Sequence, residues 1–363
     1  MPWRLWRSTA SITEDKKDWE QGMYSFEQLM WPVWDTDTIY DEFLTMVRGN
    51  GVAEAPLLYT PDAVLSVTSA DKTVQYECGR DWEIDGDIFR LTANSNIFAF
   101  AEDALIFDEA KPNESFPTAD GKHSLFHEGH FFHDRQICIT YKKHAESGFS
   151  VAYCGHRMPR MVEKLQNRDE LKIVLFGDSI AEGANSSGRS LTTPFLPTWG
   201  SLFAENLRRH YQTKINMINT SKGGMDSYWA MENAEQRVAV YEPDVAIIAF
   251  GMNDRDEGEQ FARNIEKIRA IIARKSPHTE YVLCATNAPN PRLKSFYKHQ
   301  NEYQGALMGF QEQGTVIADF YSMQKFLLQR KRFIDLTGNN VNHPNDFMIR
   351  CHAQLLSEMF IKR

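Results

Sequence analysis

Four short polar motifs in the second half of the chain bring together the residue types that acyl transfer needs. They are Gly177-Asp178-Ser179, Gly223-Gly224, Gly251-Met252-Asn253-Asp254 and Asn342-His343-Pro344. Each of the first three follows an apolar run that is typical of a buried parallel strand. Such strands end at one edge of their sheet, where ligands bind. A serine, two potential oxyanion donors and a histidine at that edge predict a serine esterase.

The serine and the histidine are the expected nucleophile and general base. Ser179 follows the apolar run 172–176, and a sharp turn after a strand would present its hydroxyl above the sheet. His343 lies on a loop before the last helix, and imidazole titrates near neutrality, which suits a general base. Taken singly, each residue has a plainer interpretation, because Gly-Asp-Ser is a common turn and a lone loop histidine is usually solvated.

The other two motifs could hold an oxyanion. Glycine lets the backbone approach a substrate oxygen closely, so the Gly224 amide could donate to it. A carboxamide donates without needing protonation, which suits Asn253. The plainer alternatives are a flexible turn for the glycines and a helix cap for the Asn-Asp pair, a role that fits Asp254 better than Asn253.

Alternating strand and helix patterns predict the scaffold that holds these motifs. Buried strands are expected at 171–176, 215–219, 244–250, 280–286 and 315–319, with amphipathic helices at 199–212 and 259–275. A last helix is expected from about Asn345 to the C-terminus, burying Leu355, Leu356 and Met359. Alternating β and α elements imply a parallel sheet covered on both faces.

The first half of the chain has a different pattern. Short β-like runs occur at 63–67, 73–76, 97–100 and 136–141, and turn residues such as those at 83–87 separate them. Many short strands with turns predict a β-sandwich or jelly-roll-like domain. The charged stretch 159–170 is interpreted as a connector. We therefore expect an N-terminal β-rich domain at 1–165 and a second domain at 166–363.

The order of the four motifs resembles the SGNH/GDSL hydrolase family over about 171–363. In that family the hallmark residues are a serine, a glycine, an asparagine and a histidine, and they match Ser179, Gly224, Asn253 and His343. The resemblance implies a flavodoxin-like three-layer α/β/α fold and hydrolysis of carboxylic esters through an acyl-enzyme. Asp178 and Asn340 are expected to border the substrate.

One position departs from the family pattern. An aspartate usually stands three residues before the histidine, where a carboxylate orients the imidazole and stabilises its charged form. This chain has Asn340 there. Its amide oxygen, a backbone carbonyl or Asp335 remain open as the group that orients His343.

The layout also resembles two-domain carbohydrate esterases of the same superfamily, in which a β-sandwich precedes the hydrolase domain and the aspartate is missing. This resemblance implies deacetylation of a carbohydrate. The alternatives are a lipid esterase or thioesterase, and a noncatalytic carbohydrate-binding protein on the same fold. The implied partner is a small-molecule or oligosaccharide ester, and the chemistry requires neither a metal nor an organic cofactor.

Three further features of the sequence have both a functional and a structural interpretation. The histidine-rich segment 127–133 lacks the HExxH spacing of a zinc site, so structural or surface roles are favoured, although one histidine could reach the active site. Segment 183–198 is either a wall of the substrate pocket or a solvated connection. The tryptophans of the first half are expected in packing rather than in sugar stacking: Trp3, Trp6, Trp19, Trp31, Trp34 and Trp82.

Composition sets broader limits on function. The net charge of −9 argues against a protein that binds nucleic acid by neutralising phosphates. Five scattered cysteines are typical of reduced thiols. No signal peptide or membrane-spanning run is visible, which favours a cytoplasmic protein, although a secreted form without its leader would look the same. The oligomeric state is not predicted.

Overall fold

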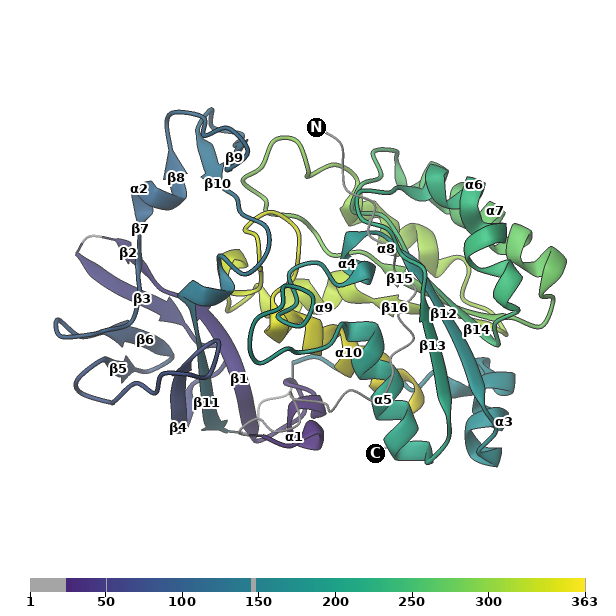
Figure 1. The fold of residues 1–363 in the computed structure, drawn as a ribbon, viewed down its shortest axis with the longest axis horizontal. Coiled ribbons are helices and arrows are strands. Elements are labelled where there is room, and N and C mark those ends of the chain that lie inside the picture. Colours follow the sequence, from purple (N-terminus) through teal and green to yellow (C-terminus); the bar gives the residue numbers. More distant parts are fainter. Residues whose placement is uncertain (1–23, 50, 145–147, 363) are drawn as a thin grey trace.

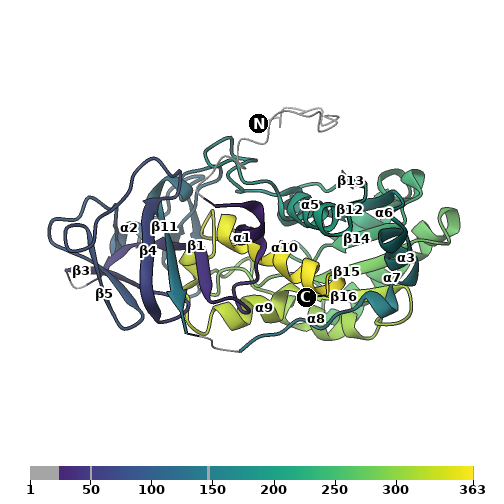
Figure 2. The ribbon, with the colours of Figure 1, turned by 90° about the horizontal axis from the view of Figure 1, so that it is seen from below.

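The computed structural model describes residues 24–49, 51–144 and 148–362. A β-rich part and an α/β part lie at opposite ends of the molecule, and the last helix, α10 (Asp346–Phe360), lies between them (Figures 1 and 2). Trp3, Trp6 and Trp19, named above, fall outside the described residues. Within those residues, no helix combines the length and apolar content needed to cross a membrane.

The α/β part is built on one parallel sheet of five strands. They are β12 (Leu171–Gly177), β13 (Ile215–Asn219), β14 (Val245–Ala249), β15 (Glu280–Ala285) and β16 (Thr315–Asp319). Their spatial order is β13-β12-β14-β15-β16, and every neighbouring pair is parallel. This is the 2-1-3-4-5 order of flavodoxin-like folds. The five predicted strands are confirmed, with ends within one residue of those expected.

Helices cover both faces of this sheet, because side chains of successive strand residues point to opposite sides. Val174 and Phe176 belong to a core shared with α6 (Ser227–Arg237), α7 (Gly258–Lys275) and α8 (Gln300–Met308). Ile173 and Leu175 belong to the other core, shared with α5 (Trp199–Tyr211), α9 (Phe320–Leu327) and α10. The predicted helices 199–212, 259–275 and the last helix are confirmed, and Leu355, Leu356 and Met359 are buried as expected.

The stretch 159–170 is not a simple connector. It contains helix α3 (Pro159–Asn167), which starts with a proline, a residue suited to the first helical position. Met161 and Leu165 are buried in the core of the α/β part. The Met161 amide donates to Glu280 Oε2 at the start of β15 (2.8 Å). Its charged residues therefore lie on the outer face of an amphipathic helix, which is why the composition alone looked like that of a linker.

The β-rich part contains three sheets. One has the order β1-β11-β4, with β1 (Thr38–Thr45), β11 (Gln136–Lys143) and β4 (Pro61–Ser69). The second has the order β5-β6-β3-β2-β7, with β5 (Trp82–Asp85), β6 (Ile88–Leu91), β3 (Val52–Pro56), β2 (Val47–Gly49) and β7 (Phe100–Ala101). The third has the order β8-β10-β9, with β8 (Ile106–Phe107), β10 (His123–Leu125) and β9 (Ser115–Pro117). A β-rich region is therefore present, but this arrangement does not confirm a jelly-roll sandwich.

Three details of the first half differ from the sequence-based expectation. Of the expected run 97–100, only Phe100 belongs to a strand, the two-residue β7. Residues 73–76 form no strand and contribute only a single bridge, between Gln75 and Thr68. The expected turn at 83–87 is mostly strand β5, and the turn itself is confined to Gly86 and Asp87, where Gly86 has a φ of 63°. Polar residues at 83 and 85 suggested a loop, but they lie on the exposed face of a hairpin strand, where charge is tolerated.

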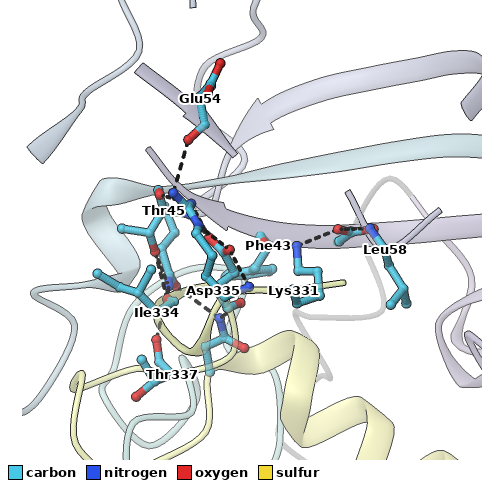
Figure 3. A network of polar contacts seen from close by, with 12 residues as sticks. Phe43, Thr45, Glu54, Leu58, Lys331, Ile334, Asp335 and Thr337 are labelled. Atoms are coloured by element: carbon cyan, nitrogen blue, oxygen red, sulfur yellow. Dashed lines mark hydrogen bonds and ion pairs between the residues drawn. The ribbon is translucent and has the colours of Figure 1, made fainter. Parts of the chain in front are cut away.

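A polar network joins the β-rich part to the loop that follows α9 (Figure 3). The Thr45 amide donates to Asp335 Oδ1 (2.8 Å), and the Thr45 hydroxyl donates to the Ile334 carbonyl (2.9 Å). Lys331 is fully buried, pairs with the buried Glu42 of β1 and donates to the Phe43 carbonyl (3.0 Å). The loop held in this way continues to His343, so the β-rich part supports one wall of the site described next.

Candidate active site

Ser179 is held at the carboxyl end of the central strand β12. The chain turns there into the short helix α4 (Ser179–Glu182), whose N-cap Asp178 accepts a hydrogen bond from the Ile180 amide (2.9 Å). The turn requires glycine at position 177, because a Cβ there would lie 2.3 Å from the Ala249 carbonyl oxygen. The serine hydroxyl is consequently presented at the edge of the sheet, in the position that the sequence predicted.

His343 comes from the loop before α10, and Asn339 shapes that loop. The Asn339 Oδ1 atom accepts hydrogen bonds from the amides of Val341 (2.9 Å), Asn342 (3.0 Å) and His343 (3.0 Å). These three hydrogen bonds to one oxygen fix the backbone of the loop. The His343 Nε2 atom lies 2.9 Å from Ser179 Oγ. Two residues that are 164 positions apart in the sequence are thus in hydrogen-bonding contact.

Two side chains contact the other ring nitrogen of His343. Asn185 Oδ1 lies 2.7 Å and Glu128 Oε2 lies 3.2 Å from Nδ1. Both oxygens are acceptors, so Nδ1 carries the hydrogen and Nε2 is left to accept the serine proton. Sequence reasoning missed both residues. Asn185 lies in segment 183–198 and Glu128 lies in the histidine-rich segment 127–133, and no spacing in the sequence links either residue to His343.

Neither side chain proposed from sequence as the orienting group contacts the His343 ring. The Asn340 amide nitrogen donates instead to Ser124 Oγ (3.1 Å) and to the Leu125 carbonyl (3.0 Å) of the β-rich part. Asp335 is engaged by Thr45 and by Arg332, which lies 2.8 Å from it. These two expectations are wrong because both side chains are used for docking. Asn340 is also buried among those partners and does not border an open surface.

The turn at Gly223 and Gly224 and the side chain of Asn253 carry the remaining candidate oxyanion donors. Gly224 has a φ of 76° and faces open space, and the neighbouring Gly223 lies against Ser179, with its amide bonded to Glu182 Oε2 (2.8 Å). Among the described residues, the amides of Ser179 and Gly224 donate to no acceptor. Asn253 Nδ2 donates to the Met225 carbonyl (3.0 Å), which leaves its second N–H for another acceptor. These three N–H groups are therefore free to donate, and the neighbouring Gly223 places the turn that carries Gly224 against Ser179.

Two buried carboxylates adjoin these residues in the chain: Asp178 precedes Ser179, and Asp254 follows Asn253. Burial raises the pKa of Asp178 to about 7, although the Ile180 amide and the nearby His343 favour its ionised form. Burial also raises the pKa of Asp254 to about 6, against hydrogen bonds from Ser227. Asp254 binds the amide and hydroxyl of Ser227, the first residue of α6. Asp254 thus anchors the start of α6, which precedes it in the chain, whereas the N-cap of the next helix, α7, is Glu257; the plainer interpretation of Asp254 as a cap of the next helix is therefore wrong. Asp178 caps α4.

Segment 183–198 and the histidine-rich segment 127–133 each place one side chain against the His343 ring. Segment 183–198 carries Asn185, and the Thr193 carbonyl lies 2.8 Å from His133 Nε2. In the histidine-rich segment, Glu128 rather than a histidine contacts the His343 ring. No cluster that could hold a metal occurs among the described residues. Of the described tryptophans, Trp34 and Trp82 are buried and Trp31 is about half exposed.

Comparison with known protein families gives a match for the second half of the chain. Residues 175–347 match the model of the GDSL-like Lipase/Acylhydrolase family. No curated protein matches the chain significantly. Among solved structures, the chain is similar to a two-domain esterase active on acetylated mannans, co-crystallised with mannopentaose, at 20% identity and a TM-score of 0.46. That match covers 56% of this chain and 53% of the other, so this chain matches about half the length of that esterase.

Two further solved structures are similar to this chain. An acetylxylan esterase from Geobacillus stearothermophilus has 15% identity and a TM-score of 0.43, covering 53% of this chain and 95% of that chain. A member of the lipolytic G-D-S-L family from Veillonella parvula has 17% identity and a TM-score of 0.40, covering 51% and 95%. The family match includes the serine, glycine, asparagine and histidine positions described above. Residues 175–347 are therefore similar to the GDSL-like Lipase/Acylhydrolase family, in agreement with the resemblance indicated by the four motifs.

Proposed function

We propose that the protein is a serine esterase that hydrolyses carboxylic esters through an acyl-enzyme. The observation that carries this proposal is the 2.9 Å contact between Ser179 Oγ and His343 Nε2. A nucleophile within hydrogen-bond reach of a base that is itself oriented by a third group is the arrangement that activates a serine. The family match supports the same reaction class.

The geometry supports the following sequence of steps. His343 Nε2 takes the proton as Ser179 Oγ attacks the ester carbonyl, and the imidazolium then protonates the leaving alcohol. The amides of Ser179 and Gly224 and the Asn253 side chain donate to the oxygen that becomes negative. Water, deprotonated by the same histidine, then attacks the acyl-enzyme, releases the acid and restores the serine.

For the substrate, we propose an acetylated carbohydrate. The support is the layout of the chain, in which a β-rich region precedes the hydrolase sheet and Asn340 replaces the family aspartate. That layout resembles two-domain carbohydrate esterases. The third group on His343, supplied by Asn185 and Glu128, speaks against a noncatalytic binding protein, because a site kept only for binding would not need an oriented base.

One observation favours a second candidate, an esterase for longer acyl chains. Leu191 and Phe195 lie on the segment that carries Asn185, and their exposed fractions are 82% and 39%. Exposed apolar side chains beside a site can bind an acyl chain. A series of p-nitrophenyl esters from acetate to octanoate separates the two candidates, because a carbohydrate deacetylase should prefer the shortest acyl group.

The first test compares acetate release by the wild type and Ser179→Ala on acetylated oligosaccharides and on p-nitrophenyl acetate. We expect the variant to lose at least about a thousandfold in kcat, because no other group can form the acyl-enzyme. Ser190→Ala is the matched control, since the hydroxyl in contact with His343 is that of Ser179 and not that of Ser190. Equal rates for Ser179→Ala and wild type, or phosphonate labelling of the variant, would contradict the proposal.

A further inference from the structure

The His343 ring has two partners where a catalytic triad has one. In a triad, a single aspartate does two things: it holds the imidazole in the right tautomer and orientation, and it stabilises the imidazolium that forms during the reaction. Here a neutral amide lies 2.7 Å from Nδ1 and a carboxylate lies 3.2 Å from it. The amide comes from the α/β part and the carboxylate from the segment between β10 and β11 of the β-rich part.

We propose that these two tasks are divided: Asn185 orients His343, and Glu128 supplies the negative charge that stabilises the imidazolium. Both are positioning residues that act through the histidine. The β-rich part is then a component of the reaction centre as well as a neighbouring domain. The proposal rests on the esterase function proposed above and assigns a role within it to a residue outside the family match.

Asn185 has the surroundings of an orienting group. Its side-chain nitrogen donates to the Gly129 carbonyl (2.8 Å) and to the Gly338 carbonyl (3.2 Å). With both N–H bonds directed at carbonyls, the amide can be oriented in only one way, with Oδ1 toward the ring. The side chain is buried, so water does not compete for that oxygen. A neutral amide held so firmly fixes direction but adds no charge.

Glu128 has the surroundings of a charged partner. Burial opposes its ionisation, but the hydrogen bond with His343, the charge of that ring and the Asn339 amide together lower the pKa of Glu128 below its ordinary value. Its side chain is about half exposed, so the interaction with the ring is partly screened. Among the described residues, no other carboxylate pairs with His343. The carboxylate is thus ionised at neutral pH and lies beside the nitrogen where positive charge develops.

The asparagine at position 340 is linked to this arrangement. Its amide nitrogen donates to the Leu125 carbonyl, at the end of β10 and three residues before Glu128. A carboxylate at position 340 could not donate that bond. The asparagine that stands in place of the family aspartate therefore binds the end of β10. From there the chain continues to Glu128, which brings another carboxylate to the same ring.

Hydrolysis of p-nitrophenyl acetate by Glu128→Gln tests the proposal. Glutamine keeps the size and an acceptor oxygen but removes the charge. We expect kcat/KM to fall about tenfold at low ionic strength, the effect of one partly screened charge near the ring, with the difference from wild type shrinking as salt is added. The acidic limb of the kcat/KM profile should move to lower pH by up to about one unit, because a nearby anion favours the protonated imidazole.

Glu114→Gln is the matched control. It removes the same charge from the same part of the chain, but Glu114 lies 3.9 Å from His127 and does not contact His343. The other charged groups near the site stay in place in both variants: Asp178 behind the serine, and the pair of Glu182 and Arg189. A displacement of the acidic limb that is confined to Glu128→Gln therefore reports on Glu128. Thermal unfolding of both variants checks that each is folded.

Two outcomes would overturn the proposal. The first is an unchanged rate and acidic limb in Glu128→Gln, and the second is the same change in Glu114→Gln. A wild type without Ser179-dependent turnover would instead remove the proposed function. In that event, an NMR titration of the His343 ring, assigned with His343→Gln, still reads the effect of Glu128. The titration midpoint should fall in Glu128→Gln, and equal midpoints would contradict the division of tasks.

Discussion

At the residue scale, the candidate site depends on donors that must already be in place when negative charge develops. Asn253 is held by the Met225 carbonyl at 3.0 Å, so its free N–H points in a fixed direction before any substrate arrives. A donor fixed in advance costs no reorganisation during the reaction, which is why such groups contribute strongly to catalysis. The residue that holds Asn253 lies 28 positions earlier in the chain, on the neighbouring turn after β13.

Asn253→Ala should therefore lower kcat by roughly a hundredfold or more, because losing one oxyanion donor typically costs about 2.7–4 kcal/mol of barrier. Steady-state kinetics on p-nitrophenyl acetate measure the effect. Asn233→Ala is the matched control, since it also removes an amide that donates to a carbonyl, in this case that of Trp229 on α6. Wild-type turnover in Asn253→Ala would exclude this residue from the mechanism.

At the scale of elements, helix α10 is buried on nearly every side because it lies between the sheet and the β-rich part. Most of its polar side chains have partners across these contacts: Arg350 donates to the Tyr40 and Asp41 carbonyls, and Gln354 donates to the Leu29 carbonyl. His352 differs. It packs against Phe320, and neither of its ring nitrogens has a hydrogen-bond partner among the described residues.

His352 should make the fold sensitive to acid. Burial lowers its pKa to about 3, so between that value and the ordinary value near 6.5 the unfolded chain binds a proton that the folded protein does not. Stability contributed by the neutral ring is complete above about pH 6.5 and falls as the pH drops through this window. When the pH is lowered from 7 to 4.5, the wild type should lose roughly 2–3 kcal/mol of unfolding free energy that His352→Leu does not lose.

Urea denaturation of wild type and His352→Leu at a series of pH values measures this difference. His156→Leu is the control, because His156 is exposed and its replacement should leave the curve parallel to that of the wild type. Parallel curves for His352→Leu and wild type would mean that this histidine is not held neutral.

At the scale of the whole molecule, the two parts are joined through buried charge. Lys331, which follows α9, and Glu42 of β1 are both fully buried and paired (Figure 3 shows the lysine). Glu42 also accepts hydrogen bonds from the Leu58 amide (2.9 Å) and the Tyr141 hydroxyl (2.6 Å). With every partner present, the pair fixes how the β-rich part sits against the loop that carries His343.

Lys331→Met should lower the free energy of unfolding by about 3–5 kcal/mol, because it leaves a buried carboxylate without its cation. The double variant Glu42→Gln/Lys331→Met should be less destabilised than the single one, since no buried charge remains. Denaturant titration measures both. Lys214→Met, which removes an exposed partner of Glu170, should cost less than about 1 kcal/mol. A Lys331→Met protein as stable as the control would show that the pair is not needed for docking.

Much of the α/β part was predictable from the sequence, because its signals are local. A buried parallel strand requires a continuous apolar run, and an amphipathic helix requires apolar residues three and four positions apart, so both can be recognised in short windows. The strands before Ser179 and Asn253 and the helix after His343 therefore ended close to the predicted residues. In the β-rich part several strands are short and their polar faces resemble turns, which is why β5 was mistaken for a loop.

The pattern of residue types alone indicated a serine, a histidine and their donors, because the edge of a parallel sheet gathers the ends of successive strands. Which groups contact the far side of the His343 ring was decided only by the tertiary structure. Asn185 and Glu128 reach that ring from 158 and 215 positions away, and Asn340 and Asp335 turn away from it to bind the β-rich part. Such contacts depend on how segments that are distant in the sequence meet in the fold, and a hydrogen bond between distant segments leaves no periodic trace in the chain.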